Sequence, residues 1–353
     1  MKIKTLAVVS VFLFTLVIFA SCADIDDLMA SSHDFPRICL VLGPGGVGDR
    51  GFNDAAVLGL LRAEMDFGIS YELLMPAADD DVFSILYPIV ESEEFDLIIV
   101  MGAGVSAEAL EKIAPLFPEQ KFSHVDSALE LANVSGAQTN WVEQTFIAGV
   151  TAGLGTLSNM PLVNRDYNKV GVIAGVDTLP MRQGILGFEA GARLVNPDVE
   201  VLVGFIGSFN DSGIAYEIAM DMYTQGVDFI QSIGGGAGLG IHEASRDAGR
   251  YSFASGANIN FIEPEHIVGV SSRDVSDMVY NEISKFMNGT WTAGLHVSGI
   301  ADGVLLHDTF QSEVVVPYEI QEVVLKKICQ IKCGELILPS FASELEYWLN
   351  SKK

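Results

Sequence analysis

The sequence predicts an α/β protein of two doubly wound lobes around a ligand cleft. Three observations indicate this class. Short apolar, β-branched runs alternate with longer amphipathic segments, which is the pattern of parallel strands joined by crossover helices. The alternation occurs in two blocks of similar size, separated by a junction near Gly136–Asn140. The roughly 320 residues that follow an N-terminal leader also exceed what one hydrophobic core usually holds.

The leader has the pattern of an export signal. Two lysines, at positions 2 and 4, precede an apolar run over 5–20 that is short for a membrane span. The sequence FASC (residues 19–22) follows and is similar to a bacterial lipobox, with Phe19 where leucine is usual. We expect a signal peptide over 1–21, a lipid on Cys22 and a tether over 22–35. The alternative is an ordinary signal peptide with an incidental cysteine.

The charge of the chain excludes several classes of partner. The formal net charge is −26, and it becomes −28 without residues 1–21, which contain two lysines and no acids. So acidic a protein is a poor partner for nucleic acid, whose phosphates require neutralising lysine or arginine. Anionic lipid is excluded on the same ground, so we expect membrane contact through acyl chains alone. With 49% hydrophobic residues the chain is not disordered.

Strands and helices are expected in strict alternation. The predicted strands are Arg37–Leu42, Tyr71–Met75, Asp96–Met101 and Lys121–Asp126 in the first block, and Lys169–Ala174, Val199–Ile206, Asp228–Ile233 and Tyr251–Ala254 in the second. The predicted helices are Asn53–Phe67, Ser106–Phe117, Met181–Val195, Gly213–Gln225 and Ile241–Ala248. In such sheets, ligands bind beyond the carboxyl ends of the strands.

The C-terminal part of the chain is too short for a third lobe. It contains two amphipathic segments, Asp274–Met287 and Tyr318–Ile331, and two short apolar ones, DGVLLHDT (302–309) and GELILP (334–339). We expect these pieces to complete both sheets, so that the chain crosses between the lobes more than once. The predicted lobes are 36–138 plus 270–298, and 139–269 plus 299–353.

A glycine loop follows the first predicted strand. Gly43, Gly45 and Gly48 spell the dinucleotide fingerprint G-x-G-x-x-G. However, the helix is expected to begin late, with Asn53 as its N-cap, and the acid required about 20 residues on is missing. A ligand loop is the better interpretation, because glycine lets the backbone approach a solute closely. A second glycine loop, SIGGGAGLGIHEA (232–244), follows a strand of the second block, and the two loops should face each other across the cleft.

Several segments resemble one family in the same order along the chain. They are GDRGFNDAAVLG (48–59), FPEQKFSHVD (117–126), EQTFIAGVTAGL (143–154), GFEAGARLVNPDVEV (187–201), GSFNDSGIA (207–215), GVDFIQSIGGGAGLGIHEA (226–244) and KCGELILP (332–339). They resemble the basic membrane protein family, the solute-binding lipoproteins of nucleoside-type ABC importers. The resemblance implies a type I periplasmic-binding fold, an ABC permease and ATPase as partners, and no catalysis.

The resemblance also implies where a solute binds. In that family an aromatic base lies between two phenylalanines, which correspond to Phe52 and Phe209; the alternative for either ring is core packing. Asn53 is a candidate hydrogen-bond partner of the ring edge, or a helix cap. Asp126 ends a predicted strand, where a buried carboxylate needs a partner, and is a further ligand candidate.

Four more residues complete the predicted site. Trp141 and Glu143 lie at the junction of the two lobes, where they either contact the ligand or pack in the hinge. Gly235 belongs to the second glycine loop. Asn258 lies in ASGANIN (254–260), the segment that corresponds to the ribose-binding part of the family.

The departures from the family pattern concern the sugar. Gly43 stands where the family has an aspartate, Ala257 or Asn258 replaces another, and Arg273-Asp274 stands near an expected lysine. The stacking pair is kept while the charged ribose clasp is largely lost. We therefore expect an aromatic heterocyclic solute, with riboflavin favoured because some relatives bind it and because its ribityl chain needs neutral hydrogen bonds. A purine nucleoside is the alternative, followed by another solute.

The sequence offers little for rival functions. The motifs G-x-S-x-G, Walker A and H-E-x-x-H are absent, and the six histidines have no metal-ligand spacing. We therefore predict no enzyme activity, no catalytic residue, no metal and no cofactor. A surface adhesin or antigen without a transport role is the rival interpretation. In either case we expect an exported protein, anchored by lipid at the periplasmic face or the cell surface.

Overall fold

The computed structural model describes residues 35–352, apart from 44–45, 49–51, 77–81 and 103–104. The chain divides into Met1–Pro36 and one compact unit, Arg37–Lys353. The expected signal peptide, Cys22 and the tether up to residue 34 lie outside the described residues. Among the described residues, none of the helices is both long and apolar enough to cross a membrane.

The first of two six-stranded sheets is entirely parallel. Its order is β11-β5-β4-β3-β1-β2. The strands are β1 (Arg37–Val41), β2 (Ser70–Leu74), β3 (Leu97–Met101), β4 (Lys121–Val125), β5 (Val134–Thr139) and β11 (Gly294–Ser298). Its helices are α2 (Phe52–Phe67), α3 (Val82–Glu91), α4 (Val105–Ile113) and α9 (Val275–Met287), with a 3₁₀ turn at Ala114–Leu116.

The second sheet is parallel except at one edge. Its order is β12-β10-β9-β8-β6-β7, and β12 runs antiparallel to β10. The strands are β6 (Lys169–Ala174), β7 (Glu200–Phe205), β8 (Val227–Ile233), β9 (Tyr251–Gly256), β10 (Ile267–Arg273) and β12 (Leu305–Asp308). The helices are α5 (Trp141–Gly155), α6 (Leu179–Val195), α7 (Ser212–Thr224), α8 (Gly238–Ala248), α10 (Tyr318–Lys332) and α11 (Leu345–Ser351), with 3₁₀ turns at Gly235–Ala237, Asn260–Ile262 and Ala342–Glu344.

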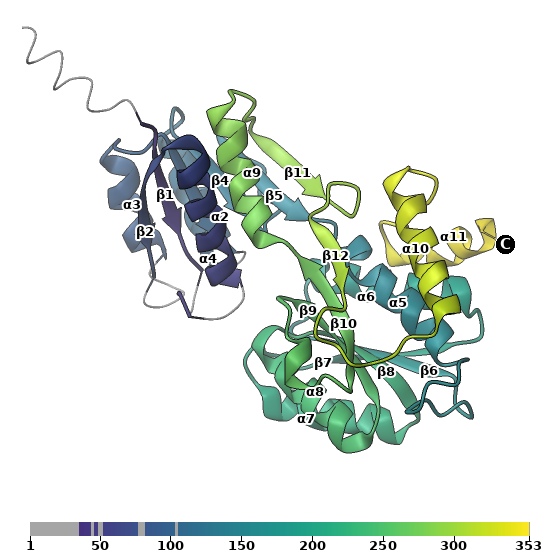
Figure 1. The fold of residues 1–353 in the computed structure, drawn as a ribbon. Coiled ribbons are helices and arrows are strands. Elements are labelled where there is room, and N and C mark those ends of the chain that lie inside the picture. The colour runs from purple at the N-terminus through teal and green to yellow at the C-terminus, as the bar shows by residue number, and fades with distance from the viewer. Residues whose placement is uncertain (1–34, 44–45, 49–51, 77–81, 103–104, 353) are drawn as a thin grey trace, which may run out of the picture. The chain divides into compact units, whose positions relative to one another are not determined.

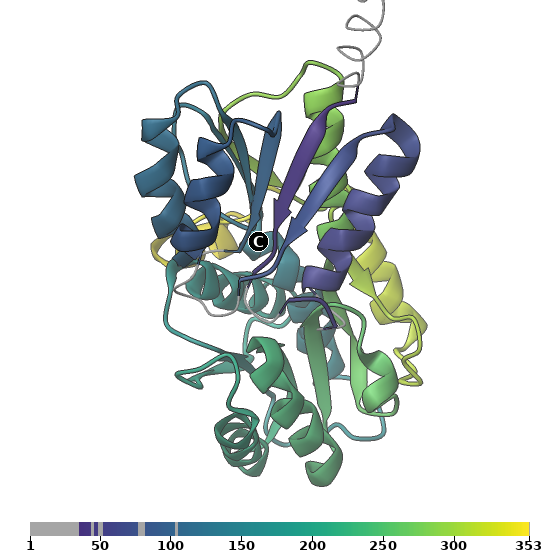
Figure 2. The same ribbon diagram turned by 90° about the vertical axis from the view of Figure 1, so that its left-hand side faces the viewer.

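Helices cover both faces of each sheet, which confirms the predicted class. In the first sheet one core lies under α2 and α9 and another under α3 and α4, and the two helix layers are seen on either side of the strands in Figures 1 and 2. In the second sheet α5 and α6 cover one face and α7 and α8 the other. Every residue of the central strands β3 and β8 is buried because helices cover both of their faces, and β3 is apolar throughout.

Helices α5 and α6 approach each other unusually closely. A Cβ atom added to Gly149 would lie 2.1 Å from the carbonyl oxygen of Phe188, and one added to Gly187 would lie 2.1 Å from that of Val142. Only glycine permits this contact, in which the backbones touch directly. The contact fixes the start of α5, where the chain enters the second lobe.

The chain changes sheets three times: after β5, after β10 and after β11. Repeated crossing was expected from the sequence. The predicted boundary at residue 270, however, lies inside β10, which belongs to the second sheet. The crossing therefore follows Arg273, at the end of that strand, because β10 pairs with β9 as far as Ser272 and with β12 as far as Arg273.

Candidate ligand cavity

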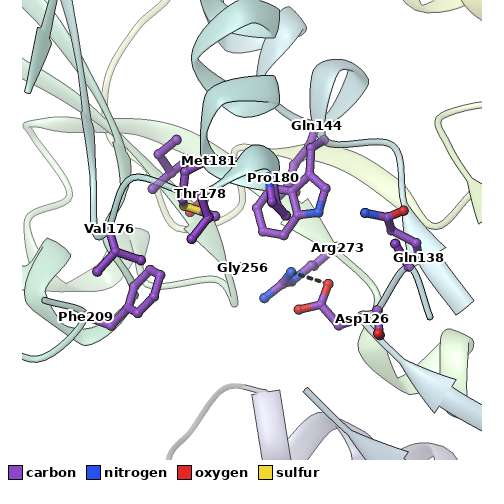
Figure 3. A pocket seen from close by; sticks show the side chains of 16 residues that line it. Asp126, Gln138, Gln144, Val176, Thr178, Pro180, Met181, Phe209, Gly256 and Arg273 are labelled. Atoms are coloured by element: carbon purple, nitrogen blue, oxygen red, sulfur yellow. Dashed lines mark hydrogen bonds and ion pairs between the residues drawn. The ribbon is translucent and has the colours of Figure 1, made fainter. Parts of the chain in front are cut away.

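A cavity of about 660 Å³ lies where the carboxyl ends of both sheets meet. The first sheet contributes Asp126 directly after β4 and Gln138 near the end of β5. The second contributes Phe209 after β7, Ser255 and Gly256 at the end of β9, and Arg273 at the end of β10. Parallel strands place their following loops at one edge, so residues distant in sequence converge here (Figure 3).

An ion pair connects the two sheets inside this cavity. Arg273 Nη1 lies 2.7 Å from Asp126 Oδ1, and the two side chains are 17% and 13% exposed. Asp126 has a φ of +66°, in the left-handed region that non-glycine residues rarely adopt. Its N–H donates to Ala137 O at 2.7 Å, which holds this conformation. Burial raises the pKa of Asp126, and the neighbouring Arg273 only partly offsets that effect.

Two aromatic rings flank the cation of this pair. The guanidinium carbon of Arg273 lies 5.0 Å from the ring centre of Trp141 and 5.5 Å from that of Phe52. These are cation–π distances, so the arginine is held by two rings as well as by a carboxylate. Of the two predicted phenylalanines, Phe209 lines the cavity, whereas Phe52 contacts the Arg273 that lines it.

Phe209 packs against the backbone of two glycines, Gly175 and Gly235. A Cβ atom added to Gly175 would stand 2.3 Å from ring carbons Cδ1 and Cε1 of Phe209, and one added to Gly235 would stand 3.4 Å from Cβ of Phe209. The side chain remains 40% exposed and faces the cavity (Figure 3). The structure thus places this ring on the cavity wall rather than in a core, and Gly235 beside it.

Sequence reasoning missed several polar side chains of the cavity. Gln138, Gln144 and Thr178 line it, and Gln144 Nε2 donates to Ser271 O at 3.2 Å. Gln138 and Arg273 lie at the ends of β5 and β10, two strands that the sequence did not reveal. Their position just before a crossing between the lobes is the signal that would have identified them.

Trp141 and Glu143 have different roles although they are close in sequence. Trp141 lines the cavity. The carboxylate of Glu143 accepts hydrogen bonds from Ile300 N at 2.8 Å and from Asn140 Nδ2 at 2.9 Å. Of the two roles left open by the sequence, the structure gives Glu143 that of hinge packing, because these contacts join two of the crossing segments. Burial raises its pKa.

Asn258 is not brought to the cavity, contrary to its expected contact with the solute. Its Nδ2 donates to Asp308 Oδ2 at 2.8 Å and to Phe310 O at 3.0 Å. These bonds fasten the segment after β12 to the end of β9. Asn258 does follow the carboxyl end of a strand, β9, as predicted. Its side chain, however, forms hydrogen bonds within the second lobe.

The first glycine loop is fastened to the helix that follows it. Gly43 N donates to Asn53 Oδ1 at 3.0 Å, and Gly48 N donates to Asp54 Oδ1 at 2.7 Å. Helix α2 begins at Phe52, so the expectation of Asn53 as the N-cap is wrong: this residue lies in the first turn, 2% exposed. A carboxylate bonded to the loop also disfavours a bound phosphate, which supports the preference against a dinucleotide site.

Comparison with known proteins agrees with this architecture. The family model Bmp, described as ABC transporter substrate-binding protein PnrA-like, matches residues 37–340. An uncharacterised lipoprotein of Pyrococcus horikoshii is 26% identical over an alignment of 312 residues that covers 82% of this chain and 76% of the relative. Basic membrane protein A1 of Borrelia garinii is 23% identical over an alignment of 335 residues that covers 93% of this chain and 94% of the relative.

A solved structure extends the comparison to the fold. A solute-binding protein of an ABC transporter system from Aeropyrum pernix superposes with a TM-score of 0.73 at 23% identity, over 90% of this chain and 98% of that one. The two-lobed arrangement is therefore that of the periplasmic-binding proteins. Members of the matched family bind a solute for a transporter and are typically not enzymes. The chain belongs to the Bmp family, the PnrA-like substrate-binding proteins of ABC transporters.

Proposed function

We propose that this protein captures an aromatic heterocyclic solute outside the cytoplasmic membrane and delivers it to an ABC permease and ATPase, with riboflavin as the favoured solute. The observation that carries the proposal is that two aromatic residues, Trp141 and Phe209, line one cavity, while a third, Phe52, contacts the Arg273 that also lines it. Phe209 comes from the second sheet, Phe52 from the first, and Trp141 from the segment between them. Aromatic side chains bind flat rings by stacking, which is worth about 1–3 kcal/mol per base.

The polar groups of the cavity favour riboflavin over a purine nucleoside. Gln138, Gln144 and Thr178 are neutral and suit a hydroxylated chain such as ribityl. At the position of the family's first aspartate, Gly43 offers no side chain, and its N–H is already bonded to Asn53. A purine nucleoside remains the second candidate, because the same rings stack on a purine.

We also propose that Cys22 carries the lipid that anchors the protein. Named relatives include lipoproteins and a basic membrane protein, which supports an exported, anchored protein. Substitution Cys22→Ala should release the protein into the soluble exported fraction. Retention of the variant in the membrane fraction would contradict the anchor.

The first test is an absorbance spectrum and mass analysis of small molecules released from the purified protein, followed by titration with riboflavin, inosine and adenosine. A flavin spectrum with riboflavin in the extract supports the proposal. A purine nucleoside supports the second candidate. If no aromatic compound is released and none of the three binds, the solute assignment is wrong, and a surface adhesin or antigen becomes the better interpretation.

Two ring deletions locate the solute. Phe52→Ala and Phe209→Ala should each weaken solute binding by about 1–3 kcal/mol, the value of a lost stacking contact. Phe83→Ala is the matched control, because Phe83 on α3 is 42% exposed, close to the 40% of Phe209, and lies outside the cavity. Equal affinities in all three variants and the parent would place the site elsewhere.

A further inference from the structure

We propose that Asp126 and Arg273 together recognise an amide edge of the solute ring, an N–H beside a carbonyl, and so select a cyclic imide or lactam. This inference rests on the proposed function, because it requires an aromatic heterocycle in the cavity. It adds the chemical class of that ring. It also gives Arg273 the role of a specificity-determining residue.

The ion pair leaves polar atoms unused on both partners. Within the part of the chain that the structure describes, Asp126 bonds to Arg273 through Oδ1 alone, and Arg273 donates through Nη1 alone. Arginine and carboxylate frequently pair through two parallel hydrogen bonds, and that geometry would have used both oxygens. Here a carboxylate oxygen and several guanidinium N–H groups remain next to each other on the wall of the cavity.

Both partners are held in place before any solute arrives. The guanidinium of Arg273 lies within cation–π distance of both Trp141 and Phe52. Asp126 is fixed by its left-handed backbone and by the hydrogen bond from its N–H to Ala137 O. A preorganised donor and acceptor lose little conformational entropy on binding, so they contribute to affinity and selectivity more than mobile groups do.

The two groups define the edge that fits. A carboxylate only accepts and a guanidinium only donates, so their ligand must offer a donor beside an acceptor. In an imide or lactam the ring N–H bonds the free oxygen of Asp126, and the adjacent carbonyl accepts from Arg273. The carbonyl oxygen has two lone pairs for the forked guanidinium, whereas the bare ring nitrogen of an adenine-type edge has one.

The test compares riboflavin with riboflavin methylated at N3, which keeps the ring and the ribityl chain but loses the imide N–H. Methylation should weaken binding to the unmodified protein by about 10- to 100-fold, because a buried carboxylate oxygen is left without a donor. In Asp126→Asn the methylation effect should fall below about threefold, since the acceptor is no longer charged. Inosine and 1-methylinosine form the parallel pair for a purine site, with adenosine as the amino-type edge.

Each outcome has one meaning. If riboflavin or inosine binds but methylation changes its affinity less than about twofold, the edge assignment is overturned while the proposed function stands. If adenosine binds as tightly as inosine, the preference for a carbonyl edge is overturned. If none of these compounds binds, both are overturned. Arg273→Lys, which keeps the charge without the fork, should reduce the discrimination without abolishing stacking.

Discussion

The two sheets are built alike but contribute different chemistry to the cavity. The first contributes a charged group, Asp126, held in a left-handed conformation. The second contributes an aromatic ring, Phe209, on the backbone of Gly175, and the cation Arg273 that reaches across to Asp126. The two sheets therefore differ in the residues at the carboxyl ends of their strands and in the loops that follow, rather than in their architecture. Repetition of the scaffold leaves those few positions free to differ.

Each half buries a histidine whose imidazole is neutral at pH 7. His124 in β4 and His242 in α8 are 0% and 1% exposed, and burial lowers the pKa of each to about 4. An unfolded histidine binds a proton near pH 6.5, so stability falls as the pH drops from there toward 4. His124→Gln and His242→Gln should each remove up to about 3 kcal/mol of this acid dependence.

Urea unfolding at a series of pH values measures this effect as a change in slope, independently of any loss of stability at neutral pH. Equal flattening by the two substitutions would show that the halves are equivalent in this respect. An unchanged slope in either variant would mean that its histidine already titrates normally in the folded protein.

The ion pair joins the two halves, with the carboxylate of Asp126 from the first and the guanidinium of Arg273 from the second. Arg273→Met should destabilise the protein by about 2 kcal/mol, less than the 3–5 kcal/mol of fully buried pairs, because both side chains keep some exposure. Arg182→Met is the matched control: its pair with Asp177 is 67% and 47% exposed, and we expect a loss within about 0.5 kcal/mol. Equal losses by thermal unfolding would remove the distinction between the two pairs.

Two glycines, Gly175 against the ring of Phe209 and Gly43 in the first glycine loop, should respond differently to substitution. Gly175→Ala should displace the ring and weaken riboflavin binding by about 1–2 kcal/mol, within the range of a stacking contact. Gly43→Ala is the control, because a Cβ atom there would meet its nearest neighbour, Asn53 Oδ1, at 3.6 Å, an ordinary contact. Both variants are titrated with riboflavin. A larger loss of affinity in Gly43→Ala than in Gly175→Ala would contradict this expectation.

The smallest effect is expected at Asn258, which follows β9 in the second sheet much as Asp126 follows β4 in the first. Asn258→Ala should cost about 1 kcal/mol of stability through its lost hydrogen bonds. Solute affinity should stay within about twofold, because the side chain bonds to the segment at Asp308–Phe310 and not to the cavity. A large loss of affinity with unchanged stability would restore the solute contact first expected for Asn258.

The fold could be predicted where strands are apolar on both faces. All eight predicted strands occur with closely similar bounds. The signal is clearest in a central strand such as β3, where burial between two helix layers produces a continuous apolar run. Strand β5 (VSGAQT) lacks such a run and was taken for a junction. Helix α3 was missed because it is short and contains Pro88. In both cases the local sequence disfavours the element, and tertiary contacts stabilise it nevertheless.

The cavity could be predicted less completely, for a related reason. Phe209 and Asp126 follow predicted strands and were found, whereas Gln138 and Arg273 depend on β5 and β10 and were not identified as cavity residues. Asn258 and Glu143 show the converse case. Their positions near strand ends or crossings were recognised, but only the folded chain reveals which neighbour each side chain bonds.

Because the chain crosses between the sheets three times, the first sheet cannot be completed until most of the second has been synthesised. β11, which covers the edge of β5 in the first sheet, lies at Gly294–Ser298, after five parallel strands of the second. A nascent or truncated chain that stops short of Gly294 therefore leaves β5 as an open edge, with unpaired N–H and C=O groups that invite association with other chains. Neither lobe is a contiguous segment that can be excised, because a strand from the last sixth of the polypeptide is needed to cover β5 at Val134–Thr139.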